Sequence, residues 1–259
     1  MIRRKDNDTF DIAKSRAARR EQLRVADLMA LTPSGGRILE IGARDCYFSR
    51  RLRGLYGEVV ALDLTRPEID EPGITPVQGD VTALGFADGS FDTVFCTEVL
   101  EHVPPALLAQ ACREITRVTK RYAVIGVPCR QDLRFGRLRC DRCGGINPPT
   151  GHLTVFDRDK LESLFPDMEA REVHRVGYGE GVTNPLSDAI FRLYGYPYGT
   201  YAQEEGCIHC GARMHRPHIG PAAKAACFVA RGLNALQNKL CRWTGIRRPN
   251  WIHILFEKK

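Results

Sequence analysis

The 259-residue sequence has no apolar run near the roughly 18 residues that a membrane-spanning helix needs. Its first ten residues, MIRRKDNDTF, are charged and have no apolar segment behind them, so we expect no secretory signal. No internal repeat or low-complexity tract is found either. These absences predict a cytoplasmic protein without a membrane span, in a compartment where thiols stay reduced.

The sequence contains ten cysteines. Because no signal for export is found, we expect these cysteines to stay reduced and not to form a disulfide framework. Two Cys-x-x-Cys pairs, Cys140/Cys143 and Cys207/Cys210, are each followed by glycine. Four thiolates are the ligand set of a closed tetrahedral zinc site. The alternatives are an iron–sulfur cluster, two redox pairs, or His209 in place of one thiol. The other cysteines stand singly, mostly beside apolar residues, and are expected to be buried: Cys46, Cys96, Cys112, Cys129, Cys227 and Cys241.

Acidic residues are almost missing from residues 211–259, which contain ten Lys or Arg and only Glu257 as an acid. This region has a net charge of +9, against +7 for the whole chain. Such a basic region favours RNA, an anionic lipid surface or a phosphorylated substrate as a partner, or it is only a solvated surface.

Short apolar segments alternate with helical patterns along the chain, which predicts parallel β-α units. The expected fold is α/β, with a doubly wound, mostly parallel, seven-stranded Rossmann-like sheet and a zinc-braced insertion of little regular structure. Strands are expected over 38–41, 58–64, 73–81, the start of 91–103, 122–128, 169–176 and 250–258. Helices are expected over 15–31, from Pro104-Pro105 onward and over 157–165, where Asp157 would cap the helix. The predicted domains are a helical extension (1–35), a core (36–177) with a zinc-type loop (129–155), an insertion or cap with the second cysteine pair (178–249) and a last core strand (250–259).

Acidic residues follow four of the predicted strands at their carboxyl ends, where ligands bind in an open parallel sheet. They are Glu40, Asp63, Asp80 and Glu98. Gly42 allows a sharp turn and a close approach to a ligand. Asp63 lies 21 residues beyond Gly42, a spacing suited to hydrogen-bonding two ribose hydroxyls. Asp80 could accept a hydrogen bond from an adenine amino group.

The dinucleotide fingerprint is missing, because Arg44 and Tyr47 stand where two of its glycines would be. Glu40 and Asp45 place negative charge beside this turn, and a pyrophosphate requires the opposite. S-adenosylmethionine carries a sulfonium and an ammonium group and has no phosphate. The local charge therefore favours S-adenosylmethionine over NAD.

The segments ILEIGARDCYFSRRL, VVALDL, GDVTALGFADGSFDTVFCTEVLEHV and YAVIGVP resemble, in order, the motifs of class I (type 11) S-adenosylmethionine-dependent methyltransferases. The resemblance covers residues 36–128, although Arg44 and Cys46 replace two glycines of the family's motif. It implies that Glu40 and Gly42 face the methionine part of the cofactor. Asp63 would then bind the ribose, and Asp80 with Val81 the adenine. The cofactor-binding set that it implies is Glu40, Gly42, Ala43, Asp63, Leu64, Asp80, Val81 and Thr97.

The segment TEVLEHV brings Glu98, Glu101 and His102 within about one helical turn, and three such side chains can bind a divalent ion. It resembles the Glu-x-x-Glu-His of ubiquinone-pathway O-methyltransferases and of small-RNA 3′-end 2′-O-methyltransferases. In those families a further histidine completes a magnesium or manganese site, and His152 stands at a comparable place. Such an ion would lower the pKa of an acceptor hydroxyl. Without a metal, His102 or His152 could be a general base.

We therefore expect methyl transfer from S-adenosylmethionine to an oxygen of a hydroxylated small molecule or glycan. The expected catalytic residues are Glu98, Glu101, His102 and His152. The first alternative is an RNA 2′-O-methyltransferase, which the basic region 211–259 favours. The second is a non-catalytic, zinc-dependent interaction protein on the same fold.

Overall fold

The computed structural model describes residues 18–178, 181–203, 206–245 and 248–259, so part of the predicted extension 1–35 lies outside it. The chain forms two compact units. The core unit consists of Arg19–Arg130, Leu153–Tyr178 and Pro249–Lys259. The cysteine-rich unit contains Gln131–His152 and Gly179–Arg248.

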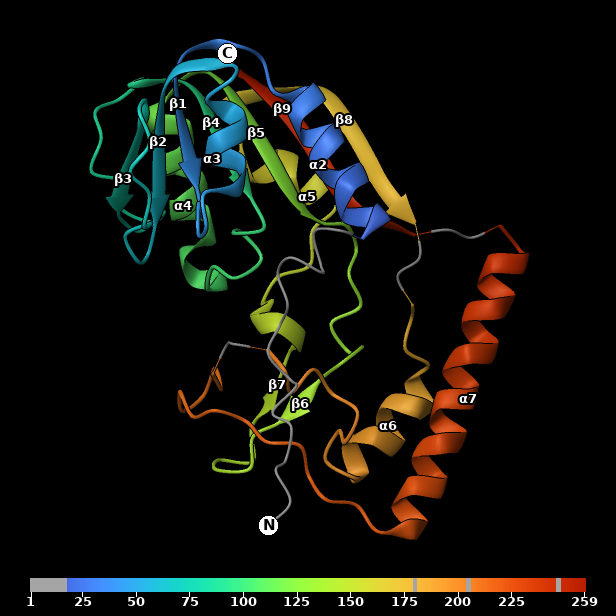
Figure 1. Cartoon of the computed structure of the whole chain (residues 1–259). Coiled ribbons are helices and arrows are strands. Elements are labelled where there is room, and N and C mark those ends of the chain that lie inside the picture. The colour runs from blue at the N-terminus through green and yellow to red at the C-terminus, as the bar shows by residue number, and fades with distance from the viewer. Residues whose placement is uncertain (1–17, 179–180, 204–205, 246–247) are drawn as a thin grey trace. The chain divides into compact units, whose positions relative to one another are not determined.

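The core unit is built on one sheet with the strand order β3-β2-β1-β4-β5-β9-β8 (Figure 1). Five strands run parallel from β3 to β5, and β9 runs antiparallel to both of its neighbours. The mostly parallel, seven-stranded sheet that the sequence predicts is therefore confirmed. The strands are β1 (Gly35–Ile41), β2 (Tyr56–Asp63), β3 (Ile74–Gln78), β4 (Phe91–Thr97), β5 (Thr119–Pro128), β8 (Met168–Tyr178) and β9 (Pro249–Lys258).

Helices cover both faces of this sheet (Figure 1). On one face, α2 (Arg19–Leu31) and α3 (Tyr47–Leu52) pack against alternate strand residues such as Ile38. On the other face, α4 (Pro105–Val118) and α5 (Arg158–Leu164) pack against the intervening residues, such as Leu39. Burial on both faces explains why the central strands are continuous apolar runs. Asp157 caps α5 as predicted, since its side chain accepts the Lys160 N–H.

The parallel register brings the ends of the central strands to one edge of the sheet. Ile41 at the end of β1 is paired with Leu62 of β2 and with Cys96 of β4. The residues that follow these positions therefore meet at the same edge, where an open parallel sheet binds ligands.

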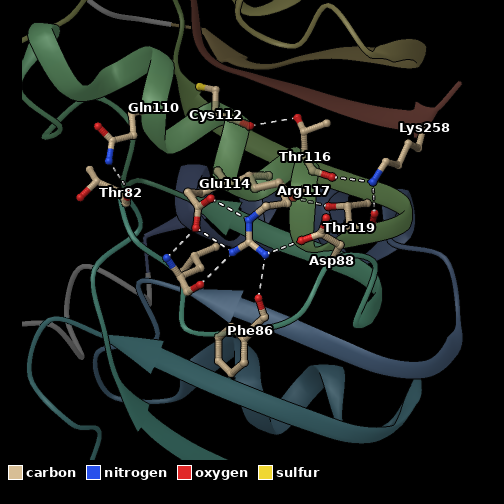
Figure 2. A network of polar contacts seen from close by, with 12 residues as sticks. Thr82, Phe86, Asp88, Gln110, Cys112, Glu114, Thr116, Arg117, Thr119 and Lys258 are labelled. Carbon is tan, nitrogen blue, oxygen red and sulfur yellow. Dashed lines mark hydrogen bonds and ion pairs between the residues drawn. The ribbon is translucent and has the colours of Figure 1, made fainter.

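A network on α4 fixes the segment that follows β3 (Figure 2). The Arg117 guanidinium donates to the Phe86 carbonyl at 2.7 Å and to the Asp88 carboxylate at 2.8 Å. The Glu114 carboxylate accepts both from Arg117 and from the Leu84 N–H. Charge-assisted hydrogen bonds of this kind are about twice as strong as neutral ones, so they hold the loop that leads from the strand end to β4.

The cysteine-rich unit has more regular structure than the sequence predicts. It contains a hairpin of β6 (Leu138–Arg139) and β7 (Ile146–Asn147), the short helix η1 (Pro149–Gly151), α6 (Pro185–Leu193) and the 23-residue α7 (Pro221–Trp243). The expectation of little regular structure was wrong for α6 and α7. The large apolar residues of α7 lie on its exposed side and small residues lie on its buried side, so its apolar pattern does not have the form of a helix that packs its apolar side inward.

None of the helices in the described residues is long and apolar enough to cross a membrane. The isolated cysteines are buried as predicted, except for Cys241 near the end of α7, which is half-buried.

Candidate functional site

In the turn that follows β1, every second residue from position 42 to position 46 has a left-handed backbone conformation. Gly42 has φ 82°, and a Cβ atom there would lie 2.3 Å from Cγ2 of Val99. Arg44 and Cys46 have φ values of 45° and 58°, although neither is glycine. Left-handed conformations cost a non-glycine residue about 1–2 kcal/mol. The loop thus retains the shape that glycines would favour, and one stabilising contact is the Arg44 N–H, which donates to Oδ2 of Asp63 at 2.8 Å.

Glu40 lies beneath this turn and is buried, with 3% of its surface exposed. Its carboxyl group accepts a hydrogen bond from the Ser49 hydroxyl. Burial raises the pKa of Glu40 to about 8, and the charges of Asp45 and Asp63 act in the same direction. A cation bound nearby would favour the ionised form, so the site is better suited to a sulfonium or ammonium group than to a phosphate.

The other predicted cofactor residues lie at the ends of β2, β3 and β4. Leu64 is largely exposed, whereas Val81 and Thr97 are buried. Oδ1 of Asp80 accepts from both the N–H and the hydroxyl of Thr82 at 2.8 Å. One oxygen of Asp80 is therefore engaged in a local turn, so an adenine amino group would have to use the other.

Two buried carboxyl groups follow β4. Glu101 is fully buried, and neither of its carboxyl oxygens has a hydrogen-bond partner. Oε1 of Glu98 is also buried without a partner, and the residue has a left-handed φ of 56°. Burial raises the pKa of both groups, the charge of Glu98 raises that of Glu101 further, and the charge of Arg24 opposes both shifts. Buried polar atoms without partners are rare in folded proteins and point to a missing ligand, proton or ion.

Arg24 on α2 is a site residue that the sequence analysis missed. Its Nε and Nη2 donate to Glu21, while Nη1 is buried without a partner. The guanidinium lies 5.7 Å from the ring centroid of Trp251. The signal in the sequence was its position four residues before Leu28, which places a charged residue on the apolar side of the helix.

His253 on β9 was also missed, together with its partner Asp27. Nδ1 of His253 lies 2.6 Å from Oδ2 of Asp27, and Nε2 is buried without a partner. Burial lowers the pKa of His253, so the neutral ring donates from Nδ1 and leaves Nε2 as an acceptor. An aspartate that orients a neutral histidine is an arrangement used in general-base catalysis. His253 and Thr97 flank Gly126, because a Cβ on that glycine would lie 3.2 and 3.1 Å from their side chains.

The two histidines predicted as catalytic belong to different units. His102 directly follows Glu101, is half-buried, and donates its backbone N–H to the Val99 carbonyl at 3.0 Å. His152 is the last residue of its segment of the cysteine-rich unit, where its Nδ1 lies 2.6 Å from Oε1 of Gln131. The metal set of Glu98, Glu101, His102 and His152 stays a prediction.

The four predicted thiols come together in the cysteine-rich unit, with all sulfur atoms within 4.8 Å of one another. The Sγ atoms of Cys140 and Cys210 are 3.8 Å apart, and those of Cys143 and Cys207 are 3.6 Å apart. Four ligands at the usual zinc–sulfur distance of about 2.3 Å form a tetrahedron with edges of about 3.8 Å. The cluster therefore fits one zinc ion, and its sulfur separations exclude disulfides, which need about 2.05 Å.

Two similar turns present these thiols. Gly144 and Gly211 have φ values of 72° and 69°, and their N–H groups donate to the carbonyls of Cys140 and Cys207. Burial raises the pKa of the Cys207 thiol, but hydrogen bonds from the His209 and Cys210 backbones and from Asn147 outweigh it, and the pKa falls to about 6. The second turn thus favours a thiolate at Cys207, whereas at Cys143 a backbone hydrogen bond is outweighed by burial and by hydrogen bonds to the neighbouring thiols, and the pKa rises to about 12.

The histidines near the cluster have other contacts. Nε2 of His209 lies 3.1 Å from the Ile146 carbonyl, and Nδ1 of His215 lies 3.0 Å from Asp141. Among the described residues, the four cysteines form this group without a histidine.

Comparison with known proteins identifies the core unit. Residues 39–125 match the family model of the methyltransferase domain. A ubiquinone biosynthesis O-methyltransferase of Burkholderia vietnamiensis is 34% identical over 95 residues, which are 32% of this chain and 41% of that protein. A demethylmenaquinone methyltransferase of Beutenbergia cavernae is 34% identical over 119 residues, which are 44% of this chain and 47% of that protein. The chain thus spans less than half the length of these curated relatives.

A solved structure supports the fold. The N-methyltransferase NodS from Bradyrhizobium japonicum WM9, in complex with S-adenosylhomocysteine, has a TM-score of 0.50 and 16% identity, covering 64% of this chain and 84% of that one. With the strand order, these matches show a methyltransferase domain with the class I fold in the core unit. The family match ends before Cys140, so it does not include the cysteine-rich unit.

Proposed function

We propose that the chain transfers the methyl group of S-adenosylmethionine to a hydroxyl oxygen of a small molecule. The observation that carries this proposal is the group of buried polar atoms without partners beside the methyltransferase strand ends, on Arg24, Glu98, Glu101 and His253. A site that leaves acceptors of raised pKa unpaired is suited to receive a proton from a hydroxyl group.

The cofactor is proposed to lie along the ends of β1 to β4. Glu40, with its raised pKa, would balance the cationic methionine end. Asp63, whose second oxygen is not used by the Arg44 N–H, would bind the ribose. The remaining proposed contacts are Gly42 and Ala43 in the turn, Leu64, Asp80 and Val81 near the adenosine, and Thr97.

Glu98, Glu101 and His102 are proposed to act on the acceptor. In one version, a carboxylate or the imidazole accepts the hydroxyl proton while the oxygen attacks the methyl group in line with the sulfonium. In the other, these three residues of the core unit hold a magnesium or manganese ion, which would acidify the hydroxyl. The unpaired carboxyl oxygens support both versions, because they need either protons or a cation.

A quinone-type hydroxyl is the first acceptor to test, because both curated relatives are named for quinone pathways. The comparisons give no support to a glycan or an RNA acceptor. One zinc ion held by the four cysteines is proposed to fasten the β6–β7 hairpin to the segment around Cys207 within the cysteine-rich unit. A cytoplasmic location is part of the same proposal.

The test measures S-adenosylhomocysteine release with hydroxylated quinone-type compounds, with and without magnesium or manganese. We expect turnover that falls at least a hundredfold in Glu101→Gln, while S-adenosylmethionine affinity stays within a few fold. Glu162→Gln, at a half-exposed carboxylate of α5 that pairs with Arg158, is the matched control. A chain that binds the cofactor but releases no product with any acceptor would favour the non-catalytic alternative.

A further inference from the structure

Helix α7 exposes an unusually apolar outer side. Its inner side packs within the cysteine-rich unit through buried Ala223, Cys227 and Ala230. Ser187 of α6 donates to the Ala230 carbonyl at 2.8 Å, and this contact fixes which side faces inward. Among the described residues of its own unit, none buries the outer side, where the large apolar residues are Phe228 (75% exposed), Val229 (56%), Leu236 (57%), Leu240 (52%) and Trp243 (85%).

A row of cations borders this apolar stripe. Lys224, Arg231 and Arg242 are separated by seven and eleven residues, spacings that return to the same side of a helix with 3.6 residues per turn. Lys239 adds a fourth positive charge, and the 23 residues of α7 include no Asp or Glu. In the described part of the chain, no acidic side chain forms an ion pair with these cations. The helix therefore presents apolar surface and uncompensated positive charge together.

We propose that α7 binds the surface of an anionic lipid bilayer. Helices that lie in a bilayer interface combine Trp, Phe and Leu on one face with Lys and Arg beside them, which is the arrangement of Phe228, Leu236, Trp243 and the cation row. The helix lies on the surface and does not span the bilayer, since its 23 residues are long enough for a membrane span but not apolar enough. This binding is independent of the proposed methyl transfer.

Charge complementarity decides between this occupant and others. A second copy of α7 would bring no acidic residue to pair with the cations, and its own cations would repel them. RNA would satisfy the cations but would leave Leu236, Leu240 and Trp243 without an apolar partner. An anionic bilayer satisfies both features, because lipid headgroups lie beside the cations and acyl chains accept the apolar side chains.

Vesicle sedimentation of the full chain tests the proposal. We expect binding to vesicles of phosphatidylcholine mixed with phosphatidylglycerol and much weaker binding to phosphatidylcholine alone. Lys224→Gln/Arg242→Gln should lower the partition coefficient about thirtyfold, or about fivefold per removed charge. Phe228→Gln/Trp243→Gln should lower it at least tenfold and should abolish a lipid-induced blue shift of tryptophan fluorescence.

The matched control is Leu107→Gln/Arg113→Gln, which removes one exposed apolar residue and one exposed cation from α4 of the core unit. This control should bind as the unchanged protein does. Equal binding of the α7 variants and the control, or equal binding to neutral and anionic vesicles, would overturn the proposal. Circular dichroism and S-adenosylmethionine affinity, measured on every variant, separate lost lipid binding from misfolding and from failure of the methyltransferase site.

Two further outcomes would identify a different occupant. Without lipid, a dimer in size-exclusion chromatography that Phe228→Gln/Trp243→Gln converts to a monomer would assign the stripe to a second copy. Mixed-sequence RNA that binds without any vesicle binding, and is lost in Lys224→Gln/Arg242→Gln, would assign the cations to RNA. Either result overturns the lipid proposal.

Discussion

Glu40, the next-to-last residue of β1, lies in surroundings that disfavour its ionised form. Its pKa is raised from an ordinary value of 4.5 to about 8, with burial as the largest cause. Between these two values the folded protein binds more protons than the unfolded chain, so its stability falls as the pH rises. Below about pH 4.5 the contribution is fully present, and above about pH 8 it is lost.

We therefore predict that the free energy of unfolding without cofactor falls between pH 4.5 and 8, with a contribution from Glu40 on the order of 5 kcal/mol. Glu40→Gln keeps an acceptor for the Ser49 hydroxyl but cannot ionise, so its denaturation curves should show a flatter pH dependence. The exposed Glu68→Gln is the control and should retain the slope. An unchanged slope in Glu40→Gln would mean that Glu40 is ionised in the folded protein.

The position of single residues could be predicted from the sequence better than the packing and the hydrogen bonds around them. The position of Glu40 at a strand end followed from the apolar pattern before it. Its pKa did not, because burial depends on packing against α3 and on Ser49, which the strand pattern does not contain. Arg24 and His253 were missed for the same reason: their neighbours at the site come from strands and helices far away in the sequence.

At the scale of secondary-structure elements, the turn between β1 and α3 depends on one glycine. Gly42 has φ 82°, and a methyl group there would lie 2.3 Å from the Val99 side chain. Gly42→Ala should weaken S-adenosylmethionine binding at least tenfold and destabilise the fold by about 1–2 kcal/mol. Calorimetric titration and thermal unfolding measure the two effects.

Gly85→Ala is the matched control for this turn, since nothing lies within 4 Å of a Cβ at Gly85 and its φ is not left-handed. It should change neither quantity appreciably. Cofactor affinity that survives in Gly42→Ala would show that the turn can move away from Val99, and the proposed contact of the turn with the methionine part would then fail.

Elements with a one-sided or continuous apolar pattern were predictable, and others were not. Every predicted core strand is found within a few residues of its expected bounds. Helix α3 is only six residues long, too short for a periodic pattern to emerge. Helix α7 has an apolar outer side, so its sequence conceals which side is inward, although Pro221 at its first turn was an available start signal.

At the scale of the whole molecule, two units are stabilised by different means. The core unit has apolar clusters on both faces of its sheet, which is the usual source of stability for an α/β domain. Around the four cysteines, the described residues of the cysteine-rich unit form a small buried cluster that includes Leu138 and Met214. A bound zinc ion would supply this unit with folding stability that so small an apolar cluster cannot provide.

We therefore predict that removing the metal unfolds one unit and spares the other. Protein purified without a chelating tag should contain one zinc ion per chain by elemental analysis, and Cys140→Ser should contain none. In Cys140→Ser or with a strong chelator, limited proteolysis should cut within residues 131–152 and 206–245, while the core unit persists and still binds S-adenosylmethionine. Cys241→Ser, a half-buried cysteine outside the cluster, should keep the metal and the resistance to protease.

Iron in place of zinc would favour the iron–sulfur alternative. A metal-free chain that resists protease would show that hydrogen bonds and apolar contacts alone hold the four thiols together.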